Sequence, residues 1–210
     1  MSIWTFFVQH LGEILTATFE HLQLVVIAMT IAILIGVPLG LLLVHRKVLR
    51  TIALGVASIL QTIPSLALFG FLIPIPFIGG IGKRTAIVAL ALYALLPILR
   101  NTYVGLTSID PAVLESAEAM GMTFTQILLR VRLPLALAFI LAGIRTATII
   151  TIGVATIAAA IGAGGLGTFI FRGVALVSDT LLLAGAIPAA LLAILADLLL
   201  GFLERRLRVT

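Results

Sequence analysis

The chain has 210 residues, of which 62% are hydrophobic, only 10% are charged and none is cysteine, and its net charge is +5. A core of this size cannot bury so much apolar surface, so the composition excludes an ordinary soluble enzyme and predicts one membrane domain; the lack of cysteine excludes disulfides and thiolate chemistry. In such a protein the positive charge orients the spans in the membrane, and we expect no nucleic-acid partner.

The N-terminal residues 3–20 are too short and too polar to cross a bilayer, yet their apolar side chains recur at helical spacing. This pattern predicts an amphipathic helix on the outer membrane interface, which we bound at residues 1–18. The alternative is a sixth, poor span. That span would place Glu13 and Glu20 close to lipid and would invert the distribution of charge described below.

Five later stretches are apolar and long enough to form transmembrane helices, each of which needs about 20 residues. They cover about residues 23–44, 52–74, 85–106, 134–160 and 180–203. These stretches form a domain that we bound at residues 19–200, followed by a cytoplasmic tail at residues 201–210. The chain is therefore predicted to be an all-α polytopic membrane protein with five transmembrane helices and an N-terminal interfacial helix.

The Lys and Arg residues are unevenly divided between the two sides that five spans create. One side has eight of them: Arg46, Lys47, Arg50, Arg130, Arg132, Arg205, Arg206 and Arg208. The other side has three: Lys83, Arg84 and Arg172. Because cytoplasmic loops carry the excess of basic residues, the count predicts an external N-terminus and a cytoplasmic C-terminus.

The second span is interrupted in its middle by Gln61, Thr62, Pro64 and Ser65. Pro64 removes a backbone donor and is expected to kink the helix. Irregular backbone at membrane depth is tolerated where it is buried in protein or lines a water-filled cavity. We therefore expect these four residues to line a translocation pathway; the alternative is a kink that serves packing alone.

The one extended polar stretch, residues 107–133, predicts two short helices. Asp110 is a good N-cap, Pro111 suits the first turn, and Gly121 can adopt the left-handed conformation that ends a helix. The second helix begins at Thr123, and a glutamine three residues later completes a capping box. The first helix carries carboxylates and small side chains and could lie in a groove of another protein; the alternative is a solvated loop that happens to be helical.

The fourth span contains Arg145 and Thr148. A charge at this depth is costly unless it is paired or hydrated. Two interpretations stay open for Arg145. It has a place in the translocation pathway, at the gate or at a subunit interface, together with Thr148, or it reaches the cytoplasmic surface or pairs with Asp197. The glycine-rich run 161–167 that follows predicts an external turn near the gate.

The segment PAVLESAEAMGMTFTQILLRVRLPLA resembles the EAA motif of ABC importer permeases. The motif positions are Glu115, Ser116, Ala117, Gly121, Leu133 and Pro134, with serine where the family has its middle alanine. The resemblance covers about residues 19–200 and implies the fold of a type I ABC importer membrane domain. It also implies that residues 107–133 form the coupling loop, which docks on a separate ATPase subunit.

The same resemblance implies the rest of the assembly. A second permease copy or a paralogue, two ATPase subunits and an extracytoplasmic binding protein would join this chain in a bacterial cytoplasmic membrane. ATP and Mg would be bound by the ATPase, because GGIGKR at residues 79–84 lacks the spacing and the final hydroxyl residue of a P-loop. We therefore expect no catalytic residue, metal site or cofactor in this chain itself.

Other segments, among them QTIPSLALFGFLIPI and AGIRTATIITIGVATIAAAIGAGGLG, look like the osmoprotectant branch, which imports glycine betaine, carnitine, choline and related compounds. Capture of a quaternary ammonium usually needs an aromatic cage. With one Trp and two Tyr in the chain, we expect selectivity to reside in the binding protein. Ergothioneine or an amino acid as substrate, an ion-coupled secondary transporter and a membrane scaffold without transport activity stay open as alternatives.

Overall fold

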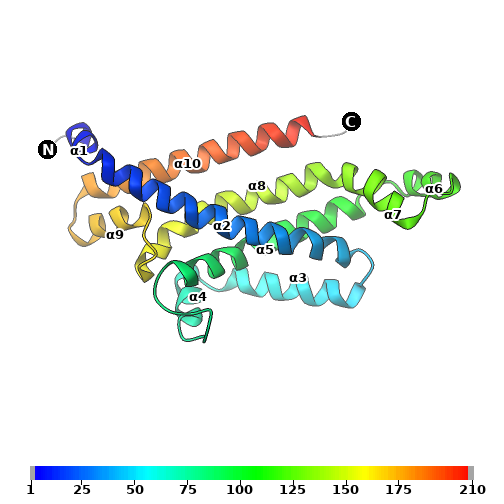
Figure 1. Cartoon of the computed structure of the whole chain (residues 1–210), viewed down its shortest axis with the longest axis horizontal. Helices are drawn as coiled ribbons and strands as arrows, with labels where there is room; N and C mark the ends of the chain where they lie inside the picture. The colour runs from blue at the N-terminus through cyan, green and yellow to red at the C-terminus, as the bar shows by residue number, and fades with distance from the viewer. Residues whose placement is uncertain (1–2, 208–210) are drawn as a thin grey trace.

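The computed structural model describes residues 3–207 as a bundle of helices, with no strand in that range (Figure 1). The α-helices are α1 (Ile3–Gln9), α2 (Leu11–Leu43), α3 (Lys47–Thr62), α4 (Ser65–Leu72), α5 (Lys83–Thr107), α6 (Pro111–Ala119), α7 (Phe124–Ile127), α8 (Leu133–Ile157), α9 (Gly167–Ala175) and α10 (Asp179–Arg206). A π-helical turn, η1 (Leu128–Arg132), joins α7 to α8, and a 3₁₀ turn, η2 (Ala158–Ile161), follows α8.

Four helical stretches are long and apolar enough to cross a membrane: Leu11–Leu43, Lys83–Thr107, Phe124–Ile161 and Asp179–Arg206. The remaining predicted span is the pair α3–α4, which is bent by 106°. Pro64 causes this break, because the residue before a proline is driven out of the helical region, and Ile63 is extended with ψ of 125°. The all-α fold with five spans is confirmed when the bent pair is counted as one span.

The N-terminal region differs from the segment predicted at residues 1–18. The helix break lies at His10, and α2 then runs without interruption from Leu11 through the first predicted span. Its 33 residues correspond to about 50 Å, which exceeds the hydrocarbon thickness of about 30 Å, so its first turns can extend beyond the lipid. The expected tail at residues 201–210 is likewise helical through Arg206, and Arg208 lies outside the described residues.

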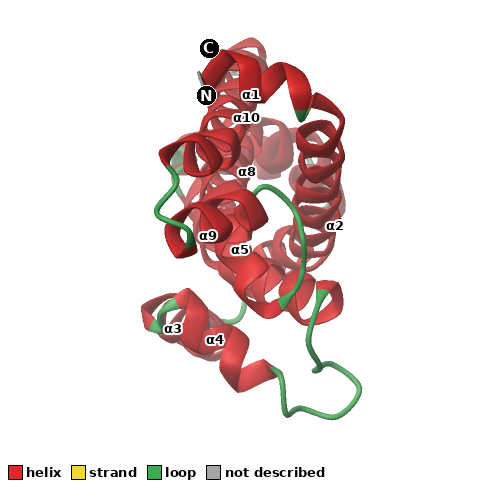
Figure 2. Ribbon diagram, turned by 90° about the vertical axis from the view of Figure 1, so that its left-hand side faces the viewer, coloured by secondary structure: helices red, strands yellow, loops and turns green. Residues whose placement is uncertain are grey.

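Helix α5 is the centre of the bundle, packing against α2 and α8, with α3 alongside it (Figure 2). Small residues permit these close contacts, since Ala86, Ala89 and Ala94 are fully buried. On α8, an ideal Cβ built on Gly143 would lie only 2.7 Å from the Cβ of Asn101 in α5. A glycine is therefore required where these two helices cross.

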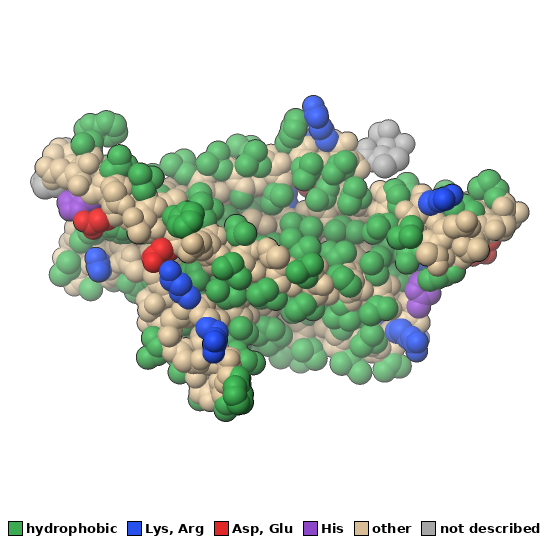
Figure 3. All heavy atoms as spheres, in the orientation of Figure 1, with side chains coloured by type: hydrophobic (Ala, Val, Ile, Leu, Met, Phe, Trp, Pro, Cys, Tyr) green, Lys and Arg blue, Asp and Glu red, His purple; other side chains and the backbone are tan. Residues whose placement is uncertain are grey.

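The outside of the bundle is apolar along its length, and charged side chains gather towards its two ends (Figure 3). Helix α10 is the most exposed of the long helices, because only 6% of its most apolar 18-residue stretch is buried by the rest of the chain. Large hydrophobic side chains cover its outer surface, including Leu191, Leu195, Leu198, Leu199 and Phe202. Such a surface is stable only when lipid or another protein covers it.

Candidate functional site

The predicted coupling segment projects from one end of the bundle as α6 and α7 (Figure 1). Helix α6 begins as expected, with the Asp110 carboxylate accepting a hydrogen bond from the backbone N–H of Ala112 at 2.9 Å and Pro111 in the first turn. Helix α7 begins with the predicted capping box between Thr123 and Gln126. These local signals determine where both helices start, because they satisfy backbone donors that a helix leaves unpaired.

Helix α6 ends in a left-handed glycine, as predicted for Gly121, whose φ is +75°. The N–H of Gly121 donates to the carbonyl of Glu118 at 2.9 Å, and the N–H of Met122 donates to the carbonyl of Ala117 at 3.2 Å. This pair of bonds is the Schellman motif, which closes a helix and reverses the chain. Gly121 therefore helps to set the angle between α6 and the following helix, α7.

The motif residues of α6 divide between one buried contact and an open surface. Ala117 is only 2% exposed and is the residue that α6 buries. Glu115 and Ser116 are exposed, and the Ser116 hydroxyl donates to the carbonyl of Ala112 at 2.7 Å along its own helix. Within residues 3–207, Glu115 forms no ion pair. The carboxylate and the small side chains around it are thus open to a partner.

Leu133 and Pro134 lie where the coupling segment becomes the fourth span. No loop separates them from α7, because α7, η1 and α8 form one helical stretch from Phe124 to Ile161. The π-turn shifts the hydrogen-bond register, so that the N–H of Leu133 donates to the carbonyl of Leu128. Pro134 has no N–H to donate, which is consistent with a register change just before it.

The residues of the interrupted second span lie together around a surface hollow of about 330 Å³. Its lining comprises Gln61, Thr62, Ile63, Pro64 and Ser65, with Tyr93 from α5 and Ile150 and Val154 from α8. The four residues predicted to line a pathway are therefore neighbours, and three different spans meet around them. Their role in transport stays a prediction.

Hydrogen bonds hold the irregular backbone of this hollow in place. The Gln61 amide donates to the carbonyl of Tyr93 at 3.0 Å, and the Tyr93 hydroxyl donates to the carbonyl of Ile63. Thr62 donates to the carbonyl of Ile59 at 2.7 Å. The carbonyl of Ile63, beside the break at Pro64, is thus satisfied by α5, while Thr62 and Pro64 are exposed.

Arg145 and Thr148 do not line this hollow. At 100° per residue they lie on the side of α8 opposite Ile150 and Val154. Arg145 instead forms a two-pronged ion pair with Asp197 of α10, with N–O distances of 2.6 and 2.9 Å. The pairing with Asp197 raised as an alternative from the sequence is thus present.

Glu204 adds a third member to this ion pair, since its carboxylate lies 3.3 Å from Arg145. On α8, the Thr148 hydroxyl donates to the carbonyl of Ile144 at 2.8 Å. These ion pairs connect α8 to α10, and the Arg145 side chain does not face the hollow.

A further polar cluster, at the end of the bundle opposite the coupling segment, was not predicted from the sequence. Glu20 of α2 accepts from Lys83 at 3.1 Å and from the backbone N–H of Gly165 at 3.1 Å. Its neighbour His21 is fully buried, with Nε2 at 3.1 Å from the carbonyl of Ile152. Two adjacent polar residues on an apolar helix were the only sequence signal, because their partners are more than 60 positions away.

A further contact missed from the sequence joins α3 to α5. The guanidinium of Arg50 donates to the Tyr103 hydroxyl at 2.5 Å and lies 5.3 Å from the centre of its ring. Arg50 had been counted only as an orienting charge. It also fixes the start of the broken span against the central helix.

The sequence matches a known protein family and is similar to several named permeases. Residues 28–209 match the family described as binding-protein-dependent transport system inner membrane component. The chain is 46% identical, over 98% of its length and 89% of the relative, to the glycine betaine/carnitine/choline transport system permease protein OpuCD of Bacillus subtilis (strain 168). It is 50% identical, over 92% of its length and 91% of the relative, to the osmoprotectant import permease protein OsmW of Salmonella typhimurium.

Solved structures have the same fold. A chain of the MetNI methionine ABC transporter in an inward-facing conformation superposes with a TM-score of 0.83 at 26% identity, covering 92% of this chain and 95% of that one. A chain of an amino acid ABC transporter with histidines gives a TM-score of 0.82 at 21% identity, over 98% and 99% of the two chains. The second likeness concerns the fold alone.

Proposed function

Because this chain belongs to the family of binding-protein-dependent transport system inner membrane components, we propose that it is the permease of an ABC importer for quaternary ammonium osmoprotectants. The observation that carries the proposal is identity of 44–50% over nearly the whole chain to permeases named for glycine betaine, carnitine, choline or osmoprotectants. The type I importer fold predicted from the sequence is confirmed. Identity to the methionine transporter chain is much lower, which favours an osmoprotectant over an amino acid.

The hollow at the break of α3–α4 is proposed as this chain's part of the solute path. Its lining exposes hydroxyls and an irregular backbone at membrane depth, which lipid cannot satisfy. A second permease copy facing this hollow would enclose it and leave water inside. Tyr93 is the one aromatic side chain in the lining, too few for a cage around a quaternary ammonium. Selectivity is therefore assigned to an extracytoplasmic binding protein.

Helix α6 is proposed as the coupling helix, docked in a groove of a separate ATPase subunit that binds ATP and Mg. The support is the projection of α6 from the bundle, the exposed Glu115 and the single buried contact at Ala117. Closure of the ATPase pair would pull on α6 and shift the balance between inward-open and outward-open states. ATP binding and hydrolysis supply the free energy for transport, and the difference in ATPase affinity for these states couples that free energy to the conformational change.

The orientation proposed for this multi-pass protein puts the N-terminus outside and the C-terminus inside. Helix α1 and the last turns of α10 lie at opposite ends of the bundle, with the coupling segment at the end where α10 finishes (Figure 1). The basic side chains of the α2–α3 turn share that end, since His45 contacts Phe124 of α7 edge-on at 5.0 Å. Lys83 lies at the other end beside Glu20. This arrangement agrees with the excess of positive charge expected in the cytoplasm.

Uptake by proteoliposomes tests the proposal. The permease is reconstituted with its ATPase and binding protein, and uptake of labelled glycine betaine, carnitine and choline is measured with and without ATP. We expect uptake only with ATP, and its loss in Glu115→Lys. The control of equal charge change is Glu13→Lys, an exposed position on α2 at the other end of the bundle. Uptake driven by an ion gradient without nucleotide would show a secondary transporter instead. Uptake of methionine alone would refute the osmoprotectant assignment.

A further inference from the structure

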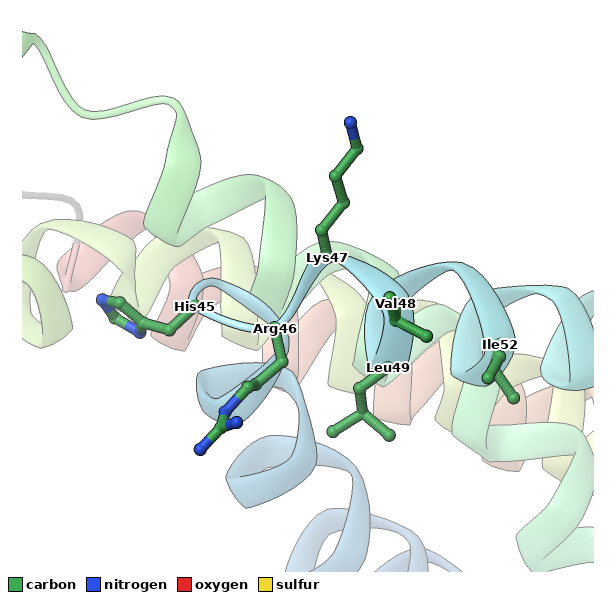
Figure 4. Close-up of a pocket in the computed structure, with 6 residues that line it drawn as sticks. All are labelled: His45, Arg46, Lys47, Val48, Leu49 and Ile52. Atoms are coloured by element: carbon green, nitrogen blue, oxygen red, sulfur yellow. The ribbon is translucent and has the colours of Figure 1, made fainter.

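The turn between α2 and α3 carries basic side chains between two apolar hollows. The larger hollow, of about 570 Å³, is lined by His45, Arg46, Lys47, Val48, Leu49 and Ile52 (Figure 4). The smaller hollow, of about 260 Å³, is lined by Leu41, Leu42, His45, Arg46, Phe124 and Leu128. Arg46 therefore belongs to both, with apolar side chains on either side of it.

Two adjacent cations of this turn, Arg46 and Lys47, are exposed on the protein surface. Within residues 3–207, neither side chain forms an ion pair or a hydrogen bond, and both are exposed. Arg50, one turn further along α3, is occupied by Tyr103. In Figure 4, Arg46 and Lys47 point to opposite sides of the ribbon, so each presents its charge separately on the surface of this turn.

An apolar stripe leads away from these cations along α3. Val48, Ile52, Val56 and Ile59 are 74%, 57%, 52% and 64% exposed, and their spacing of four, four and three residues places them on one helix face. From Val48 to Ile59 the stripe is about 16 Å long. That length is close to half of the hydrocarbon thickness of about 30 Å, which is the depth of one leaflet.

We propose that this corner binds an anionic diacyl phospholipid of the inner leaflet. Its phosphate lies at the membrane surface beside this turn, where both cations attract it, and an acyl chain follows the stripe from Val48 towards Ile59. Basic side chains beside cytoplasmic helix ends attract anionic lipids, each by about fivefold in affinity, so the two cations together contribute about 25-fold. Docking of the ATPase would account for the cations but not for a stripe that continues to the middle of the membrane. The site does not depend on which solute is transported.

Native mass spectrometry of the full chain in detergent tests the site. The protein is titrated with phosphatidylglycerol and with phosphatidylcholine carrying the same acyl chains. We expect tighter binding of phosphatidylglycerol, and a loss of about 25-fold in the double variant Arg46→Gln, Lys47→Gln with phosphatidylcholine unchanged. The matched control is Arg84→Gln, Arg172→Gln, which removes two exposed cations at the opposite end and is expected to bind phosphatidylglycerol as the parent does.

The acyl contact is tested separately. Ile52→Asn, Val56→Asn is expected to weaken both lipids, and glycerol phosphate, which lacks acyl chains, is not expected to compete. Equal affinity of the parent for the two lipids would overturn the proposal, as would an equal loss in the control. Competition by glycerol phosphate would indicate an ion site. Loss of ATPase copurification in the Arg46, Lys47 variant, with lipid binding intact, would identify a subunit contact instead.

Discussion

Replacement of Gly121 tests whether the turn after α6 positions the coupling helix. The residue has φ of +75°, and no atom lies within 4 Å of the place where a Cβ would stand. A substitution therefore introduces no clash, and its effect comes from backbone conformation alone. For an L-residue the left-handed conformation costs roughly 1–2 kcal/mol, so Gly121→Ala should lower the population of the native turn roughly 5–30-fold relative to alternatives.

The choice of side chain separates this effect from mere removal of glycine. Asn tolerates the left-handed region better than other residues, whereas a β-branched residue is a true outlier there. We expect Gly121→Asn to retain most of the ATPase activity stimulated by solute and binding protein in proteoliposomes, Gly121→Ala to lose part of it, and Gly121→Val to lose most. All three should insert normally, as judged by yield and gel filtration. Equal damage in Asn and Val variants, or full activity in Val, would refute the reasoning.

Three further predictions concern packing, the ion pair and the hollow. Gly143→Ala should destabilise the permease by about 1–3 kcal/mol in detergent melting, because its Cβ would meet Asn101, whereas Gly153→Ala on the same helix has nothing within 4 Å and should not. Arg145→Leu should lower the melting temperature more than Asp197→Leu does, because it leaves two carboxylates without their cation, whereas Arg145 keeps Glu204 when Asp197 is removed. Equal losses would contradict this. Gln61→Leu should lower the rate of osmoprotectant uptake with little change in the stimulated ATPase activity. The control is Ser58→Ala, which changes an exposed residue of α3 outside the lining of the hollow. Unchanged uptake in Gln61→Leu would show that Gln61 is not part of the path.

Local signals in the sequence were enough to predict the coupling segment in detail. Asp110, Pro111, Gly121 and Thr123 each act through backbone groups a few residues away, so their caps and turns form without reference to the rest of the fold. The break at Pro64 is predictable for the same reason. The angle of that break is not, because it depends on how Tyr93 of α5 accepts and donates hydrogen bonds around it.

Contacts between elements that are distant in the sequence could not be predicted from it. Glu20 looked like a residue that lipid would exclude, yet it is stabilised by Lys83 and by the backbone of Gly165. The interfacial segment was bounded at residue 18, whereas α2 continues through this point without a break. From the sequence, Arg145 could either line a pathway or pair with Asp197. The structure distinguishes these roles, because it shows that Arg145 on α8 faces Asp197 on α10.

Two helical elements connect the coupling segment with the hollow, and under the proposed mechanism they would carry a pull on α6 to the proposed solute path. One is the uninterrupted helix from Phe124 past Ile150, about 39 Å at the helical rise, whose crossing with α5 at Gly143 can serve as its pivot. The other is α3, which begins beside His45, in contact with Phe124, and ends at Gln61 and Thr62. Under the proposed mechanism, a movement of α7 is therefore expected to act on both walls of the hollow together. The π-turn just before Pro134, where the first element departs from α-helical register, is the place where we expect it to bend.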